Sequence, residues 1–98
     1  MKECTDQELI EKLKGGENPA LNELMARYKH RLFAFIRRYV GDEDLAYDLV
    51  QETFTKLYFS VATYKSEYTF STWLFQIALN LCRDHGRKKK LVQFFSID

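Results

Sequence analysis

Residues 64–90, YKSEYTFSTWLFQIALNLCRDHGRKKK, join an aromatic loop to an amphipathic helix pattern with a basic end. Apolar residues recur every three to four positions, which is typical of a helix with one buried face. The spacing predicts a helix that begins near Phe70, with Thr69 or Ser71 as its cap, and ends near Arg87. Its expected buried arc is Phe70, Trp73, Leu74, Ile77, Ala78, Leu81 and Cys82.

The chain before this stretch repeats the helical period and shows no strand alternation. Thr5-Asp6-Gln7-Glu8 fits a capping box for a short N-terminal helix ending at Gly15-Gly16. Asn18, as a cap, and Pro19 begin a second helix that Gly41 stops. The expected apolar stripe of this helix is Leu21, Leu24, Met25, Tyr28, Leu32, Phe35, Ile36 and Tyr39.

A third helix is expected to begin at Asp42 or Asp44, where acids suit a helix N-terminus. Residues 63–69 form a polar break before the fourth helix, and Leu91–Asp98 resembles the beginning of a linker. The sequence therefore predicts an all-α fold: a small bundle of three long helices plus a short N-terminal helix. The apolar face of the third helix is Leu45, Leu49, Val50, Phe54, Leu57, Tyr58 and Val61.

The composition indicates a single small domain with enough apolar material for a core, because 46% of the 98 residues are hydrophobic. No transmembrane or signal segment is apparent, so we expect a soluble, cytoplasmic protein without membrane insertion. Cys4 and Cys82 are expected to be free thiols. Cys82-x-x-His85 supplies two ligands where zinc needs about four, so we expect neither a metal site nor a cofactor.

Charge is sorted into blocks although the formal net charge is only +1. Residues 27–38 carry five bases and no acid, residues 42–52 five acids and no base, and residues 83–90 five bases and one acid. Two differently charged surfaces, or neighbouring blocks that offset one another across helix faces, would both produce this pattern.

The polar side of the fourth helix and the loop before it suit nucleic acid with unstacked bases. Polar side chains on this helix can contact phosphates and base edges, and the basic end can hold the backbone. In the loop, the Tyr64 ring is not expected to lie wholly in the core, so it can wall a pocket or stack on an extruded base beside Ser66. The alternative is an ordinary solvated face, with Phe70 and Trp73 in the core. The stripe comprises Thr72, Gln76, Asn80, Arg83 and Arg87.

The non-core side of the third helix carries a second candidate surface, the acceptor patch Asp48, Gln51, Glu52 and Thr55. Acceptors at i, i+3 and i+4 suit Arg, Lys or backbone donors on a partner. An acid–base pair is not favoured, because no histidine or nucleophile stands nearby in the pattern. No phosphate-binding glycine loop is present either, so we do not expect an enzyme.

The strings DLVQETFTKLY (48–58) and FSTWLFQIALN (70–80), followed by Asp84 and Arg87-Lys88, closely resemble region 2 of bacterial sigma factors of the extracytoplasmic-function (ECF) group. The resemblance covers roughly residues 18–90. It implies that Asp48, Gln51 and Glu52 dock on the coiled coil of the RNA polymerase β′ clamp. It also implies that loop 62–69 and helix 70–87 bind the melted non-template strand of the −10 promoter element, with one base flipped out.

The residues expected to bind DNA combine this resemblance with the polar stripe and the loop. Lys56 and Asn80 stand where the resemblance implies contacts to the strand, and Tyr64 stands where such factors commonly have an aromatic. The complete set is Lys56, Tyr64, Ser66, Thr72, Trp73, Gln76, Asn80, Arg83, Arg87 and Lys88.

The chain departs from the ECF pattern in two ways. It lacks the second domain, region 4, so residues 1–95 are expected to be the region 2 domain and residues 96–98 the start of an inter-domain linker. Gln76, Arg83 and His85 occupy variable positions, so no promoter sequence can be transferred. The expected partners are the polymerase core (β′), the −10 non-template strand and an anti-sigma factor. The alternatives are a sigma-like decoy or anti-sigma-binding module without DNA binding, and a helix-turn-helix domain that prefers duplex DNA.

Overall fold

The computed structural model of the protein describes residues 4–64, 67 and 69–95, with residues 88–95 described by their backbone alone. Its elements are α1 (Asp6–Lys14), α2 (Pro19–Val40), α3 (Glu43–Ser60), the short 3₁₀ helix η1 (Val61–Thr63) and α4 (Phe70–Phe95). Every regular element in these residues is helical, which confirms the predicted all-α bundle of three long helices and one short one.

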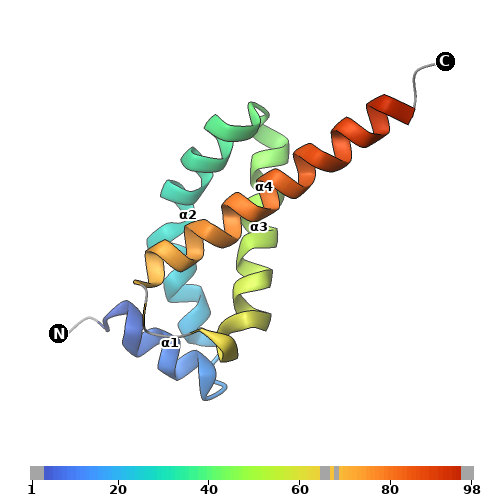
Figure 1. Cartoon of the computed structure of the whole chain (residues 1–98). Helices are drawn as coiled ribbons and strands as arrows, with labels where there is room; N and C mark the ends of the chain where they lie inside the picture. The colour runs from blue at the N-terminus through green and yellow to red at the C-terminus, as the bar shows by residue number, and fades with distance from the viewer. Residues whose placement is uncertain (1–3, 65–66, 68, 96–98) are drawn as a thin grey trace.

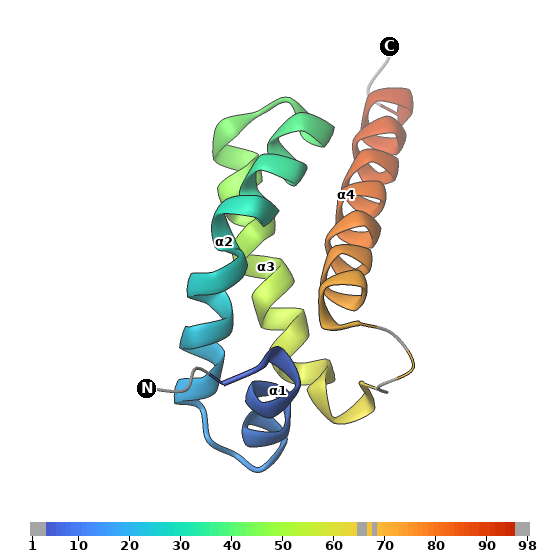
Figure 2. The same ribbon diagram turned by 90° about the vertical axis from the view of Figure 1, so that its left-hand side faces the viewer.

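The long helices pack as an antiparallel pair with a third helix laid across it. Helices α2 and α3 run side by side, and α4 crosses both obliquely (Figure 1). Helix α1 lies at the end of the pair where α2 begins, next to η1 (Figure 2). The C-terminal turns of α4 extend past the α2–α3 pair in Figure 1. The core between the helices includes the fully buried Leu24, Leu32, Ile36, Leu57 and Leu74.

Two of the predicted helix starts are confirmed in their capping geometry. The amide of Glu8 donates to Thr5 Oγ1 at 3.1 Å, and the Glu8 carboxylate accepts from the Thr5 amide at 3.4 Å, which completes the capping box. At the start of α3, Asp42 Oδ1 accepts from the Leu45 amide at 2.9 Å. Asp42, the first of the two alternatives, is therefore the cap.

Asn18 is the cap residue of α2 and Pro19 its first residue, as predicted, but the Asn18 side chain does not make the capping bond. Asn18 already has helical backbone angles (φ −55°, ψ −32°) and makes no side-chain capping bond. Its Oδ1 instead accepts from the hydroxyl of Tyr58, with an O···O distance of 3.3 Å. This contact draws the beginning of α2 toward the end of α3.

The cap of α4 is confirmed, whereas its predicted end is wrong. Thr69 Oγ1 accepts from the Thr72 amide at 3.3 Å. The helix then passes through Gly86 and continues to Phe95, beyond the expected end near Arg87 and into the segment expected to begin a linker. A single interior glycine costs only about 1 kcal/mol relative to alanine, and the Arg and Lys residues that follow are good helix formers. Residues 96–98 lie outside the described residues.

Several side chains depart from the predicted core. Tyr39 and Tyr58 were expected in apolar stripes, yet they are 52% and 36% exposed. Tyrosine tolerates such positions because its hydroxyl end is polar. Thr53, absent from the predicted face, is fully buried and donates to the carbonyl of Leu49 at 2.7 Å. That bond satisfies the hydroxyl, so this threonine can occupy an apolar position. Within the described residues, no helix combines the length and apolar character needed to cross a membrane.

Candidate nucleic-acid interface

The polar stripe of α4 is a continuous exposed surface. Thr72, Gln76, Asn80, Arg83 and Arg87 are all exposed, opposite the buried Leu74, Ala78 and Leu81. The Gln76 amide donates to Asn80 Oδ1 at 3.1 Å, so these two side chains orient each other. Arg87 pairs with Asp84 at 2.8 Å, whereas Arg83 has no carboxylate within 4 Å among the described residues. The stripe therefore offers amide groups in its middle and, beyond them, the Arg83 guanidinium, which has no carboxylate partner in the part of the chain that the structure describes.

The expectation that the Tyr64 ring does not lie wholly in the core is wrong. The residue is only 5% exposed, and its ring centroid lies 4.8 Å from that of Trp73 and 6.5 Å from that of Phe70. The chain after η1 turns back toward α4, so this loop residue is covered by the aromatics that begin the helix. Burial raises the pKa of Tyr64, and the charge of Asp6 adds to the shift. Trp73 itself is half-buried.

Helix α1 holds the beginning of the loop through Lys14. The Lys14 ammonium donates to the carbonyl oxygen of Tyr64 at 3.1 Å and lies 5.7 Å from the centroid of the Tyr64 ring. One cation therefore contacts both the backbone and the face of the aromatic ring. Sequence reasoning missed Lys14 because it lies 50 positions before Tyr64, and no periodic pattern connects residues at that separation.

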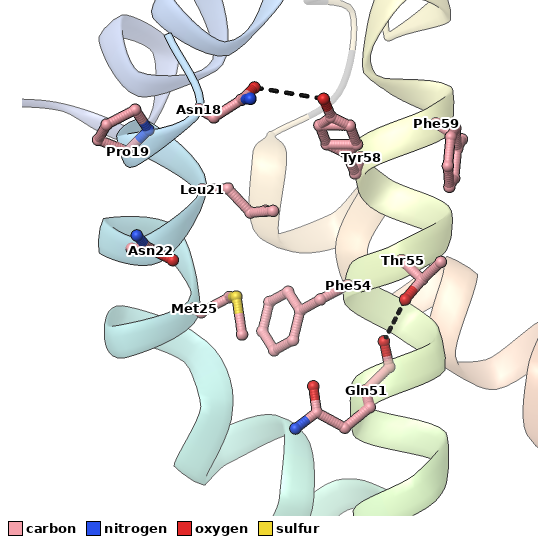
Figure 3. Close-up of a pocket in the computed structure, with 10 residues that line it drawn as sticks. All are labelled: Asn18, Pro19, Leu21, Asn22, Met25, Gln51, Phe54, Thr55, Tyr58 and Phe59. Carbon is pink, nitrogen blue, oxygen red and sulfur yellow. Dashed lines mark hydrogen bonds between the residues drawn. The ribbon is translucent and has the colours of Figure 1, made fainter.

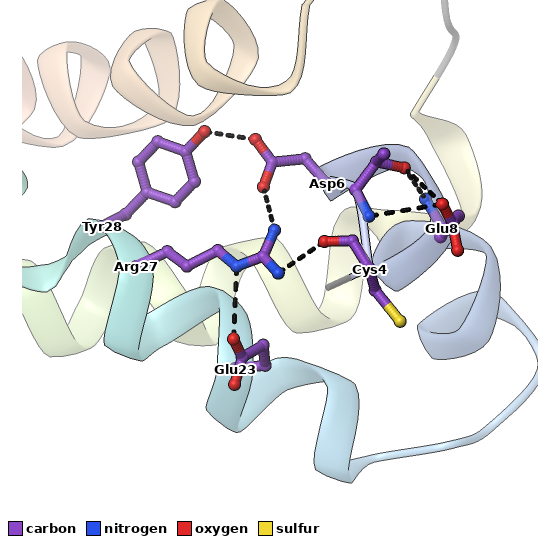
Figure 4. Close-up of polar contacts among 7 residues, drawn as sticks. Cys4, Asp6, Glu8, Glu23, Arg27 and Tyr28 are labelled. Carbon is purple, nitrogen blue, oxygen red and sulfur yellow. Dashed lines mark hydrogen bonds and ion pairs between the residues drawn. The ribbon is translucent and has the colours of Figure 1, made fainter. Parts of the chain in front are cut away.

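A polar cluster ties α1 to α2 and, through one ring, to α4 (Figure 4). Asp6 accepts from the hydroxyl of Tyr28 and from Arg27, whose Nη1 lies 3.1 Å from Asp6 Oδ1. Arg27 also pairs with Glu23 at 3.3 Å. The Tyr28 ring makes an edge contact with Phe70, with centroids 5.3 Å apart. The first residue of α4 is thus supported from two other helices.

The loop and α1 together border a shallow depression of about 410 Å³. Glu67 and Thr69 are exposed at its rim, and the rings of Tyr64 and Phe70 contribute apolar walls. Ser66 lies outside the described residues, so its predicted contact to a base stays a prediction. The residues that line the depression are Thr5, Asp6, Gln7, Tyr64, Glu67, Thr69 and Phe70.

The acceptor patch of α3 is exposed throughout and borders a groove that the sequence did not predict. Asp48, Gln51, Glu52 and Thr55 are all exposed, and Thr55 bonds back to the carbonyl of Gln51 at 3.0 Å. Figure 3 shows Gln51 and Thr55 on one wall of the groove between α2 and α3. The volume of the groove is about 530 Å³.

The groove has apolar walls and an exposed aromatic at its edge. Met25 of α2 faces Phe54 of α3 across it in Figure 3, and Leu21 lies beside them. Phe59 is 80% exposed, which is unusual for phenylalanine. No clear sequence signal indicated this exposure, because adjacent helical residues such as Leu49 and Val50 are both buried in the same helix.

The cysteines offer no catalytic or metal chemistry in the described residues. Cys82 is buried, and burial raises the pKa of its thiol, which disfavours the reactive thiolate. No group of three or more His, Cys, Asp or Glu side chains within the described part of the chain is arranged to hold a metal ion.

Comparison with known proteins identifies the family. Residues 24–92 match the family model for sigma-70 region 2. The chain belongs to the sigma-70 region 2 family. The match includes most of α2, all of α3 and most of α4, so both the stripe and the acceptor patch lie on this region 2 domain. The ECF resemblance agrees with the relatives that follow.

The relatives of this region 2 domain include ECF sigma factors. It is 37% identical over 83 residues to the ECF RNA polymerase sigma-E factor of Haemophilus influenzae, covering 85% of this chain and 43% of that protein. It is 35% identical over 80 residues to the RNA polymerase sigma-H factor of Pseudomonas aeruginosa, covering 82% and 42%. The chain therefore spans less than half the length of these relatives.

A solved structure extends the likeness to three dimensions. This region 2 domain resembles an engineered region 2 of sigmaE, studied by NMR in complex with GTAAAA, with a TM-score of 0.83 and 36% identity. The alignment covers 92% of this chain and 95% of the other.

Proposed function

We propose that this chain is a sigma factor domain that binds the −10 element of a promoter as single-stranded non-template DNA and attaches to RNA polymerase through the β′ clamp. The observation that carries the proposal is the exposed stripe of α4. The domain that carries this stripe is 36% identical in sequence to an engineered region 2 of sigmaE whose structure was solved with GTAAAA. Its role is binding during transcription initiation, without catalysis.

The stripe and the depression are proposed to bind different parts of the DNA. Gln76 and Asn80 present amide groups that can pair with base edges, and Arg83 together with Lys56 of α3 can contact phosphates. All four are exposed, and Lys56 has no carboxylate within 4 Å in the described part of the chain. The depression beside the loop is the proposed place for a flipped base. In this proposal the Tyr64 ring forms part of the wall of that depression and does not stack on the base from an exposed position.

The free energies of base stacking and base extrusion indicate that the domain needs polymerase to melt a duplex. Stacking of one base on an aromatic is worth about 1–3 kcal/mol, while extruding a base from a duplex costs a few kcal/mol. The domain alone is therefore expected to bind a strand that is already single and to leave a duplex closed. Attachment to polymerase adds the remaining free energy of melting.

The acceptor patch and the groove beside it form the proposed polymerase face. Asp48 and Glu52 supply negative charge, and the groove that Gln51 borders supplies apolar area. A partner with basic and apolar side chains fits both features. The 80% exposure of Phe59 supports a protein partner on this side.

The test is a panel of single-stranded hexamers derived from GTAAAA, each changed at one position, bound to wild type and to Asn80→Ala. We expect wild type to prefer one sequence, and Asn80→Ala to lose about 1–3 kcal/mol of discrimination at one position only. Gln76→Ala tests the neighbouring amide in the same way. If wild type binds no hexamer while polymerase binding is retained, the domain is a protein-interaction module and the DNA assignment fails.

A further inference from the structure

A second basic surface lies on α2, outside every residue assigned above. Arg31, Ala34, Phe35, Arg38 and Tyr39 line a shallow hollow of about 570 Å³ on this helix. Both arginines and Tyr39 are exposed. We call this surface the α2 ledge.

The two arginines of the ledge are not neutralised. Neither Arg31 nor Arg38 has a carboxylate within 4 Å among the described residues, whereas Arg27, earlier on the same helix, pairs with Asp6 and Glu23. Residues 27–38 contain no acid at all, so the helix itself supplies no counter-charge. The Arg31 guanidinium is nevertheless positioned, because it lies 4.5 Å from the centroid of the Tyr28 ring.

The ledge adjoins the DNA-binding side of α4. Phe35, which lines the hollow, packs edge-on against Phe75 of α4 with ring centroids 5.3 Å apart. Phe75 directly precedes Gln76, a member of the exposed stripe. A strand held on the stripe therefore needs only to pass around α4 for its continuation to reach the ledge.

We propose that the α2 ledge binds the phosphodiester backbone of DNA that flanks the single-stranded hexamer. Two guanidinium groups that have no carboxylate partner among the described residues suit phosphates, which they can contact with paired N–H donors. The exposed ring of Tyr39 adds an amphipathic contact at the rim, since its hydroxyl can donate to a phosphate oxygen. Continuity with the stripe favours DNA over an acidic protein. The inference rests on the proposed function.

The experiment compares DNA length and charge variants of the whole chain. The double variant Arg31→Gln/Arg38→Gln is matched by Lys29→Gln/Arg37→Gln, which removes the same charge from exposed positions of the same helix that do not line the hollow. Each is titrated with GTAAAA alone and with the same hexamer continued into a duplex at its 5′ or its 3′ end, between 50 and 200 mM salt as in common practice.

On one of the two extended DNAs, the ledge variant is expected to bind about tenfold more weakly at low salt and to lose about 2 from the slope of log affinity against log salt. The matched control should keep most of that slope, and the ledge variant should bind the bare hexamer within about twofold of wild type. Equal losses in both double variants would overturn the inference, because they would reflect net charge alone.

The remaining outcomes also decide the matter. Equal weakening on the bare hexamer would make the ledge part of the single-strand site, and unchanged binding to both extended DNAs with reduced binding to polymerase would assign it to a protein. Either outcome would refute the inference. Failure of the proposed function is recognised separately, because wild type would then not distinguish GTAAAA from a scrambled hexamer.

Discussion

The substitution Tyr64→Ala distinguishes two roles for this residue: a buried ring that supports the fold, or an exposed ring that stacks on a base. The residue is 5% exposed and packs against the rings of Trp73 and Phe70. Removing a buried large aromatic to alanine costs about 3–5 kcal/mol. The free energy of unfolding of a domain of this size is about 5–15 kcal/mol, so Tyr64→Ala is expected to remove about a fifth or more of its stability.

The expected loss is large enough for a simple melting experiment. One kcal/mol shifts the Tm of a 60–100-residue domain by about 4–8 °C, so Tyr64→Ala should melt at least about 12 °C below wild type. Tyr64→Phe keeps the ring and should stay within about 1.5 kcal/mol of wild type. Tyr39→Ala is the matched control, because that tyrosine is 52% exposed, and its stability should change by about 0.5 kcal/mol or less.

Affinity for GTAAAA, measured at low temperature and corrected for the folded fraction, completes the comparison. A buried support predicts that the folded fraction of Tyr64→Ala binds within about tenfold of wild type, since Phe70 and the other lining residues of the depression remain. An exposed stacking group predicts the reverse, an unchanged Tm and a loss of about 1–3 kcal/mol in binding. An unchanged Tm in Tyr64→Ala would refute the packing argument.

Three further predictions follow from the contacts. Asp48→Arg should weaken binding to the β′ subunit in a pull-down while leaving the melting temperature within a few degrees, because Asp48 is exposed and unpaired among the described residues; unchanged binding would contradict the polymerase face. Lys14→Met should cost about 1–3 kcal/mol of stability in urea unfolding through its lost bond to the Tyr64 carbonyl. Lys12→Met should cost less, because the exposed Lys12 ammonium contacts only the Cys4 thiol among the hydrogen-bond partners described. Burial raises the pKa of Tyr64, and burial together with the hydrogen bond to Asp6 raises the pKa of Tyr28. The contribution of these two hydroxyls to stability should therefore be complete below pH about 10 and decline as the pH rises further. Urea unfolding with absorbance titration of the tyrosines checks the direction, and constant stability to pH about 11 would contradict it.

The helices were predictable because their signals are local. The capping box at Thr5, the proline at Pro19 and the apolar period of α4 each depend on residues within a few positions of one another. The end of α4 was not predictable in the same way. Gly86 and the basic run suggested a stop, yet helix propensity there remains adequate, and the helix continues to Phe95.

Side-chain positions that depend on long-range packing were the ones sequence reasoning missed. A polar loop context suggested an exposed Tyr64, but its burial depends on how the loop turns back onto α4. The groove between α2 and α3 required knowing which helix edges face each other, and its walls come from Met25 and Phe54, which lie far apart in sequence. Exposure of the acceptor patch and the stripe was predictable, because polar side chains at helical spacing opposite an apolar arc face solvent.

Helix α1 connects the stability of the fold with Tyr64 and Phe70, the residues on either side of the loop proposed to bind DNA. It lies outside residues 24–92, which match the family model, yet it supplies Lys14 to the loop and Asp6 to Tyr28. The Tyr28 ring in turn supports Phe70, where α4 begins. These contacts hold Tyr64 and Phe70, which both line the depression, in place within the fold. A preformed site loses less conformational entropy on binding than one that must be ordered by the strand. Loss of α1 should therefore weaken hexamer binding even though the amide groups of the stripe stay in place on α4.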